Sequence, residues 1–211
     1  MNDFVFDFDC LGFRAEPYAA APMLVFRLRI REVSGRPVRA IALRCQLRIE
    51  PARRHYTDTE AIRLAGLFGE RARWGDTLKP LQLAVLPVMV PAFTGSIEVD
   101  VPLPCSYDLE VATGQYFHAL DDGEIPLLML FSGTVFTPDG IAPIPWDREC
   151  HHRMPVAVWR DLMEMYFPGG GWLRLTRETL DALQDFKHRQ AIPTWDGAVT
   201  ALLREVPADE L

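Results

Sequence analysis

Two stretches near the start of the chain alternate strictly between apolar and polar residues, and this alternation constrains the fold more than any other feature. They read Phe-Arg-Leu-Arg-Ile-Arg at 26–31 and Ile-Ala-Leu-Arg-Cys-Gln-Leu-Arg-Ile at 41–49. Successive side chains of a β-strand point to opposite faces, so a period of two predicts half-buried strands. Residues 34–37, Ser-Gly-Arg-Pro, are typical of a turn. We therefore predict a hairpin whose outer face is covered by guanidinium groups.

Further strands are predicted by four apolar runs that Pro and Gly interrupt. The runs lie at residues 81–89, 97–103, 107–111 and 125–136. Short strands with frequent turns suit an antiparallel sandwich better than alternating strands and helices. We expect six to nine strands in total.

Helices are predicted at four places. Thr57 and Glu60 have the spacing of a capping box, which predicts a short helix at 57–69. After Pro155 the apolar residues recur at helical spacing, and the glycines at 169–171 end that helix. Thr176 and Thr194 have the residue type of helix N-caps and predict two more helices. The residues expected on the buried faces of these last two helices are Leu180, Leu183, Phe186, Trp195, Ala198, Val199, Leu202 and Leu203.

Together these patterns predict an α+β fold. Residues 1–150 form an antiparallel β-sandwich-like body with one short helix, and residues 151–211 form a C-terminal three-helix subdomain packed on it. A chain of 211 residues is long enough to bury a core without metal or disulfides.

Composition excludes several classes of function. A formal net charge of −7 argues against general binding of nucleic acid, which rewards a basic surface. No apolar run reaches the roughly 18 residues of a membrane-spanning helix, so we predict no membrane insertion. The start of the chain lacks a signal-peptide pattern and the four cysteines are widely separated, which favours reduced thiols in the cytoplasm. No motif for a cofactor is present, and we expect none.

The densest group of reactive side chains is Cys150-His151-His152. A thiolate beside imidazoles binds zinc or acts as a nucleophile in other proteins, so one hypothesis is a metal-binding or thiol-dependent enzyme centred on these residues. In an extended chain Cys150 and His152 share one side while His151 points away. Because a metal site needs more ligands than these two, a structural or surface role is the simpler interpretation.

Charge is distributed unevenly along the chain. The charged residues between positions 27 and 54 are nine arginines and only two glutamates. Every charged residue between 95 and 125 is acidic. The simpler interpretation is pairing of arginines with carboxylates across strands inside the fold. The alternative is a surface that orients a protein partner. The residues that we predict to bind such a partner are Arg27, Arg29, Arg31, Arg44, Arg48, Glu98 and Asp100.

A third hypothesis is a sandwich that binds a small ligand or an unfolded chain on exposed aromatic side chains. The candidates are Tyr116, Phe117 and Trp146.

Several segments resemble an uncharacterised bacterial family whose members are encoded beside nickel-iron hydrogenase genes. The likeness covers nearly the whole chain and is carried by residues 17–18, 45–51, 125–136, 145–149, 156–160 and 193–195. The resemblance identifies no catalytic residues in this chain. It implies a cytoplasmic accessory role in hydrogenase assembly or activity. We therefore predict a non-enzymatic interaction protein whose partner is a hydrogenase subunit or maturation factor.

Overall fold

The computed structural model describes residues 4–105, 109, 113–170 and 174–205. The chain divides into two compact units, Met1–Gly169 and Gly170–Leu211.

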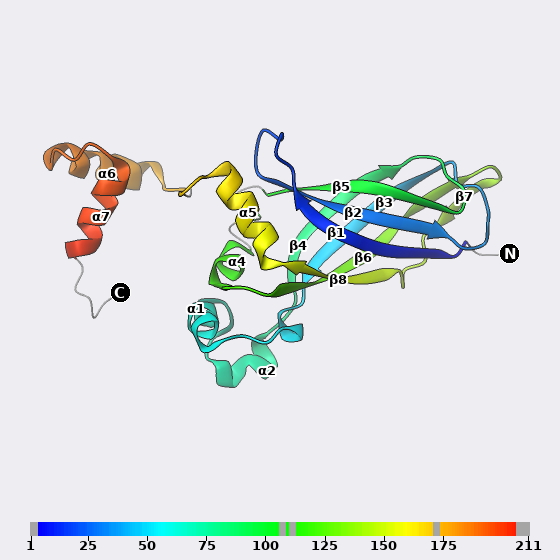
Figure 1. Cartoon of the computed structure of the whole chain (residues 1–211), viewed down its shortest axis with the longest axis horizontal. Helices are drawn as coiled ribbons and strands as arrows, with labels where there is room; N and C mark the ends of the chain where they lie inside the picture. Colours follow the sequence, from blue (N-terminus) through cyan, green and yellow to red (C-terminus); the bar gives the residue numbers. More distant parts are fainter. Residues whose placement is uncertain (1–3, 106–108, 110–112, 171–173, 206–211) are drawn as a thin grey trace. The chain divides into compact units, whose positions relative to one another are not determined.

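The first unit is built around two antiparallel sheets (Figure 1). The first sheet has the order β1 (Phe6–Ala15), β2 (Met23–Glu32) and β5 (Ser96–Pro104). The second sheet has the order β4 (Leu81–Val90), β3 (Ala40–Ile49), β6 (Glu124–Thr137) and β7 (Gly140–Pro143), with β8 (Glu149–Pro155) also paired to β6. The predicted α+β fold with a sandwich-like body is confirmed. The predicted strand at 107–111 lies outside the described residues, apart from Leu109.

The predicted hairpin of the two arginine-bearing strands is wrong. Strand β2 pairs with β1 and β5, whereas β3 pairs with β4 and β6, so the two strands belong to different sheets. Alternation shows which side chains are buried but not which strand lies alongside. Here the apolar faces of both strands turn towards the shared core, where Leu28 of β2 and Cys45 of β3 are fully buried. Across this core, Phe8 and Phe131 stack with ring centroids 4.1 Å apart.

The shorter elements of the first unit lie at one end of the sheets (Figure 1). They are η1 (Pro51–Arg53), α1 (Asp58–Phe68), η2 (Arg71–Arg73), α2 (Trp74–Thr77), α4 (Gln115–Ala119) and α5 (Val156–Tyr166). Helix α1 begins after the predicted capping box: the Glu60 amide donates to Thr57 Oγ1 over 3.2 Å, and the Thr57 amide donates to Glu60 Oε2 over 3.0 Å.

Helix α5 belongs to the first unit, although the sequence placed it in a subdomain that begins at residue 151. The Tyr166 hydroxyl donates to the carbonyl of Glu16 over 2.6 Å. The Trp159 ring stacks on Phe117 with centroids 4.4 Å apart. These contacts join α5 to the loop after β1 and to α4 within the first unit.

The second unit holds α6 (Arg177–Arg189) and α7 (Trp195–Glu205). Both predicted N-caps are present: the hydroxyl of Thr176 accepts from the Thr179 amide over 3.2 Å, and that of Thr194 accepts from the Gly197 amide over 3.1 Å. By itself this unit buries only Ala198 of the eight residues predicted on the buried faces. Two helices of this length have too little surface between them to bury a full apolar face.

Within the described residues, no helix has the length and apolar character needed to cross a membrane.

Candidate functional site

The arginines of β2 are neutralised by carboxylates of neighbouring strands. Arg27 Nε lies 2.8 Å from one Glu98 oxygen, and Arg29 Nη2 lies 2.7 Å from the other. Arg31 Nη2 lies 3.3 Å from Oδ2 of Asp9 on β1. The hydrogen bond from Arg29, helped by the charge of Arg27, holds the pKa of Glu98 below its ordinary value. The outer face of the first sheet therefore satisfies its own charges.

The second carboxylate predicted to bind a partner, that of Asp100, also forms an ion pair within the sheet. Its Oδ2 accepts from Nη2 of Arg14, on β1, over 2.8 Å. Arginine and carboxylate thus alternate across three antiparallel strands, as the simpler interpretation of the charge pattern expects.

The arginines of β3 differ. Arg44 has Pro87 and Ser132 as its cross-strand neighbours, and Arg48 pairs in register with residues 82 and 128, which are Gln and Leu. Among the residues that the structure describes, neither arginine has an ion pair with a carboxylate. Arg44 and Arg48 alternate with the buried side chains of β3 and therefore lie on the outer face of the second sheet. They are therefore the predicted partner-binding residues without a carboxylate partner in the described part of the chain.

An apolar group lies beside Arg44 on the same face. Met89 of β4 is 68% exposed, Phe136 of β6 is 40% exposed and Ile141 of β7 is 74% exposed. Strand β3 lies between β4 and β6, and its Ala42 is opposite Met89 while its Ala40 is opposite Phe136. We call this surface the outer patch, and its members are Ala40, Ala42, Arg44, Met89, Phe136 and Ile141.

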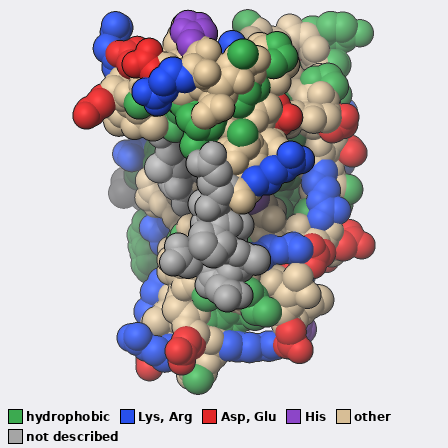
Figure 2. All heavy atoms as spheres, turned by 90° about the vertical axis from the view of Figure 1, so that its left-hand side faces the viewer, with side chains coloured by type: hydrophobic (Ala, Val, Ile, Leu, Met, Phe, Trp, Pro, Cys, Tyr) green, Lys and Arg blue, Asp and Glu red, His purple; other side chains and the backbone are tan. Residues whose placement is uncertain are grey.

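Figure 2 shows acidic and basic side chains lying next to each other at several places on the side of the molecule that it draws.

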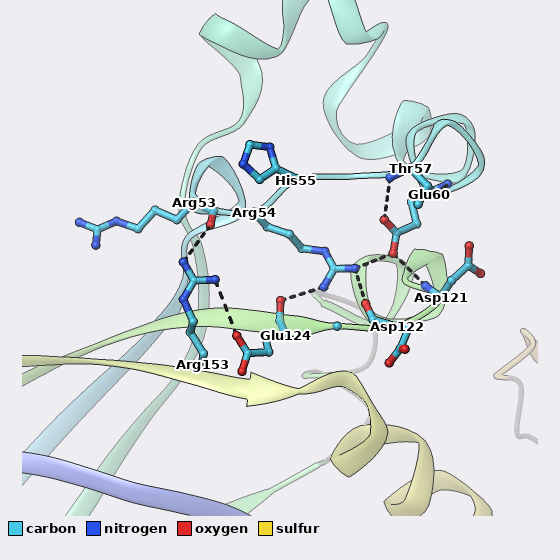
Figure 3. A pocket seen from close by; sticks show the side chains of 10 residues that line it. Arg53, Arg54, His55, Thr57, Glu60, Asp121, Asp122, Glu124 and Arg153 are labelled. Carbon is cyan, nitrogen blue, oxygen red and sulfur yellow. Dashed lines mark hydrogen bonds and ion pairs between the residues drawn. The ribbon is translucent and has the colours of Figure 1, made fainter.

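A second candidate is a surface pocket of about 450 Å³ between the start of α1 and the start of β6. Figure 3 shows the Arg54 side chain extending across it to the carboxylate of Glu60. Nη2 of Arg54 lies 2.5 Å from Glu60 Oε1, and both side chains are buried. Nη2 also donates to the carbonyl of Asp122 over 2.6 Å, and Nη1 donates to that of Glu124 over 2.8 Å.

Two more arginines hold the segment 120–124 that lines this pocket. Arg63 of α1 lies 2.5 Å from Oδ1 of Asp121, and Arg160 of α5 donates to the carbonyls of Leu120 and Asp121. The amide of Asp121 donates to Glu60 over 2.9 Å. The charged groups of the pocket thus largely satisfy one another, which indicates a structural junction of α1, α5 and β6. Sequence reasoning identified Glu60 as a helix cap but missed Arg54, whose partners are distant along the chain.

The group at Cys150 is split between two faces of β8. His151 is exposed and its Nδ1 lies 3.3 Å from Glu50, whereas Cys150 and His152 are half-buried and share the other face. Burial raises the pKa of Cys150 to about 11 and that of nearby Cys10 to about 12. Burial also lowers the pKa of His152 below its ordinary value.

These directions favour a neutral thiol and a neutral imidazole at physiological pH. A nucleophilic cysteine reacts as its thiolate, and the raised pKa of Cys150 disfavours this form. The described part of the chain contains no group of three or more His, Cys, Asp or Glu side chains arranged to hold a metal ion. Cys150 and His152 therefore do not belong to such a group there.

The aromatic residues proposed to bind a ligand are not on one surface. Tyr116 and Phe117 are buried, with 0% and 3% of their surface exposed, whereas Trp146 is 92% exposed. The hydroxyl of Tyr116 lies 2.9 Å from that of Tyr56 inside the core. Tyr116 and Phe117 are core residues, because their short helix is enclosed between α1 and α5.

Comparison with curated proteins gives no match. Among solved structures, a protein from Archaeoglobus fulgidus is 10% identical, covers 72% of this chain and 98% of its own, and has a TM-score of 0.30. The putative ApaA protein from Bordetella pertussis is 11% identical, covers 72% of this chain and 94% of its own, and has a TM-score of 0.30. A putative late embryogenesis abundant protein is 10% identical, covers 72% of each chain and has a TM-score of 0.32. TM-scores this low support no conclusion about function.

The comparison with protein families gives a match over almost the whole chain. One family model matches residues 1–210, which includes both sheets and both compact units. The model describes a family of unknown function, in keeping with the uncharacterised family that the sequence resembles. The chain therefore belongs to DUF6084, a family of unknown function.

Proposed function

We propose that the chain is a non-enzymatic accessory protein that binds another protein through the outer face of its second sheet. The observation that carries the proposal is the contrast between the two arginine-bearing strands. Arg29 has a carboxylate at 2.7 Å, whereas Arg44 has no carboxylate partner among the described residues. Uncompensated charge at a surface gives steering and specificity towards a partner of opposite charge.

The proposed partner is a subunit or maturation factor of a nickel-iron hydrogenase, in the cytoplasm. Support for this identity comes from the resemblance of the sequence to a family encoded beside hydrogenase genes. The chemistry of the chain is compatible with an accessory role, because the raised pKa of Cys150 disfavours a reactive thiol.

The test is affinity purification of the tagged chain from cells that produce both the chain and a nickel-iron hydrogenase. We expect the wild type to recover a hydrogenase component and the double variant Arg44→Gln/Arg48→Gln to recover much less. The matched control is Arg27→Gln/Arg29→Gln, which makes the same chemical change on the first sheet and should recover the component normally. Thermal unfolding of each variant shows that the fold is kept.

Two outcomes would contradict the proposal in different ways. Recovery of no hydrogenase component by the wild type excludes the proposed partner. Equal recovery by both double variants excludes the outer face of the second sheet as the binding surface.

A further inference from the structure

The geometry points to the outer patch as a recognition site for an acidic amphipathic segment of a partner protein. This inference rests on the proposed function, since it assumes that the chain binds a protein, and it adds what the bound segment must look like. The patch contains one cation and exposed apolar side chains, but none of its own members is acidic.

The apolar part of the patch spans four strands. Ala42 lies opposite Met89 on β4 and opposite Thr134 on β6, and Ala40 lies opposite Phe136. Phe136 in turn pairs with Ile141 of β7. Short alanine side chains thus stand between the longer side chains of β4 and β6. A single incoming apolar side chain can contact β3, β4 and β6 together.

Strands β3 and β6 approach each other closely beneath this part of the patch. A Cβ atom on Gly133 would lie 2.2 Å from the carbonyl oxygen of Ala42. Glycine is therefore required at this position, and the register of β3 against β6 under the patch depends on it.

The charged part of the patch is one row further along β3. Arg44 is exposed, and its cross-strand neighbours Pro87 and Ser132 offer no charge. On the first sheet each of Arg27, Arg29 and Arg31 has a carboxylate within 2.8, 2.7 and 3.3 Å, respectively. An arginine beside exposed apolar side chains is the composition of energetic centres in protein interfaces. The missing carboxylate is therefore assigned to the partner.

The distance between the apolar part of the patch, at Ala42, and its charged part, at Arg44, sets the spacing of the matching residues in the partner segment. Ala42 and Arg44 are two residues apart on one strand, which places them roughly 7 Å apart. A segment that matches both carries an apolar residue and a carboxylate at a similar separation. Residues two apart in an extended segment, or three to four apart on one helix face, meet this requirement.

The charge also disfavours a second copy of the chain as the occupant. Two copies joined by a two-fold axis would use the same patch on both sides of the interface. Two Arg44 guanidinium groups would then share an interface that lacks a compensating carboxylate from the patch. A segment rich in Asp or Glu avoids this repulsion.

The experiment uses the full chain in the cells that naturally produce it. The photo-crosslinking residue benzoylphenylalanine replaces Met89, and in a matched control it replaces Ser96, which is exposed on the first sheet opposite Arg31. After irradiation, mass spectrometry identifies the crosslinked peptide. We expect the Met89 position to crosslink to another protein at a segment with an apolar residue and a carboxylate within four positions. Arg44→Glu should lower the yield about tenfold or more, since charge-assisted hydrogen bonds contribute about 1.5–3 kcal/mol.

A charge exchange then tests the pairing. Replacing the partner carboxylate by Arg should restore crosslinking to the Arg44→Glu variant. The inference is overturned by a crosslinked segment without a carboxylate, by crosslinks to a second copy or to residues 170–211 of the same chain, or by equal yields from the two positions. If affinity purification recovers a partner that position 89 does not touch, the proposed function stands and this site does not. If neither experiment finds a partner, both are wrong.

Discussion

Arg54 and Glu60 form a buried ion pair in which Nη2 lies 2.5 Å from Oε1. Only 7% of the Arg54 side chain and 2% of the Glu60 side chain are exposed. Glu60 also caps α1 and accepts the amide of Asp121, so one carboxylate joins the helix start to the segment before β6. Removal of one partner from such a pair leaves a buried charge without compensation.

We therefore predict that Glu60→Ala lowers the free energy of unfolding by about 3–5 kcal/mol. Urea denaturation followed by circular dichroism measures this loss. Asp122→Ala is the matched control, because the backbone carbonyl of Asp122, and not its carboxylate, accepts from Arg54. The control should change stability little, and an equally mild effect of Glu60→Ala would show that the network is not a structural junction.

Gly133→Ala should destabilise the second sheet strongly. Gly133 has φ = +149°, and an added Cβ would lie 2.2 Å from the carbonyl oxygen of Ala42. Backbone strain and overpacking, each costing about 1–3 kcal/mol, should together lower stability by about 3 kcal/mol or more. Gly12→Ala separates the two effects, because Gly12 has φ = +155° but no atom within 4 Å of the added Cβ. If both variants lose the same stability in urea denaturation, crowding between β3 and β6 is unimportant.

Glu98 should titrate at a lower pH than an ordinary glutamate. Its pKa is lowered first by the hydrogen bond from Arg29 and then by the charge of Arg27. Because the folded-state pKa is the lower one, the stabilisation is present above the unfolded-state pKa and is lost as the pH falls through the folded-state pKa. NMR titration of the carboxyl carbon measures the shift directly. Arg29→Gln should bring the pKa back towards its usual value, and an unchanged titration would show that this pair is absent in solution.

The buried thiols should react slowly at neutral pH. Burial raises the pKa of Cys10 to about 12 and of Cys150 to about 11, and it also raises the pKa of Cys45. Alkylation by iodoacetamide requires the thiolate, so the rate should increase steeply with pH and on unfolding in urea. Mass spectrometry of the alkylated peptides gives the rate at each cysteine. Rapid alkylation of Cys150 in the folded protein at neutral pH would instead favour the thiol-enzyme hypothesis.

Local patterns predicted the elements that depend on local physics. The capping box at Thr57 and the N-caps at Thr176 and Thr194 are present because each involves residues only three positions apart. Strand β1 was missed, although Phe6 and Phe8 alternate with aspartates and carry the same period-two signal. Strand β7 was missed because its four residues, Gly-Ile-Ala-Pro, are too few to show an alternation. Strand β8 was missed because most of its residues are polar on both faces.

The candidate site could be predicted only in part. Arg44 was identified as outward-facing from the alternation, but its lack of a carboxylate could not be read from the sequence. The carboxylate that pairs with Arg29 lies 69 residues away, on a strand whose neighbours are set by the sandwich. The sequence also could not predict that Met89, Phe136 and Ile141 lie together, since they come from three different strands.

The sequence by itself determined which side chains of β2 and β3 turn inward, where α1, α5, α6 and α7 begin, and the α+β class, because periodicity and capping act within a few residues. Only the tertiary structure decided that β2 and β3 enter opposite sheets, because alternation sets which face of a strand is buried and leaves its neighbouring strand open. That decision gave the arginines of β2 carboxylate partners and left Arg44 without one. Arg48 of β3 likewise has no carboxylate partner among the described residues.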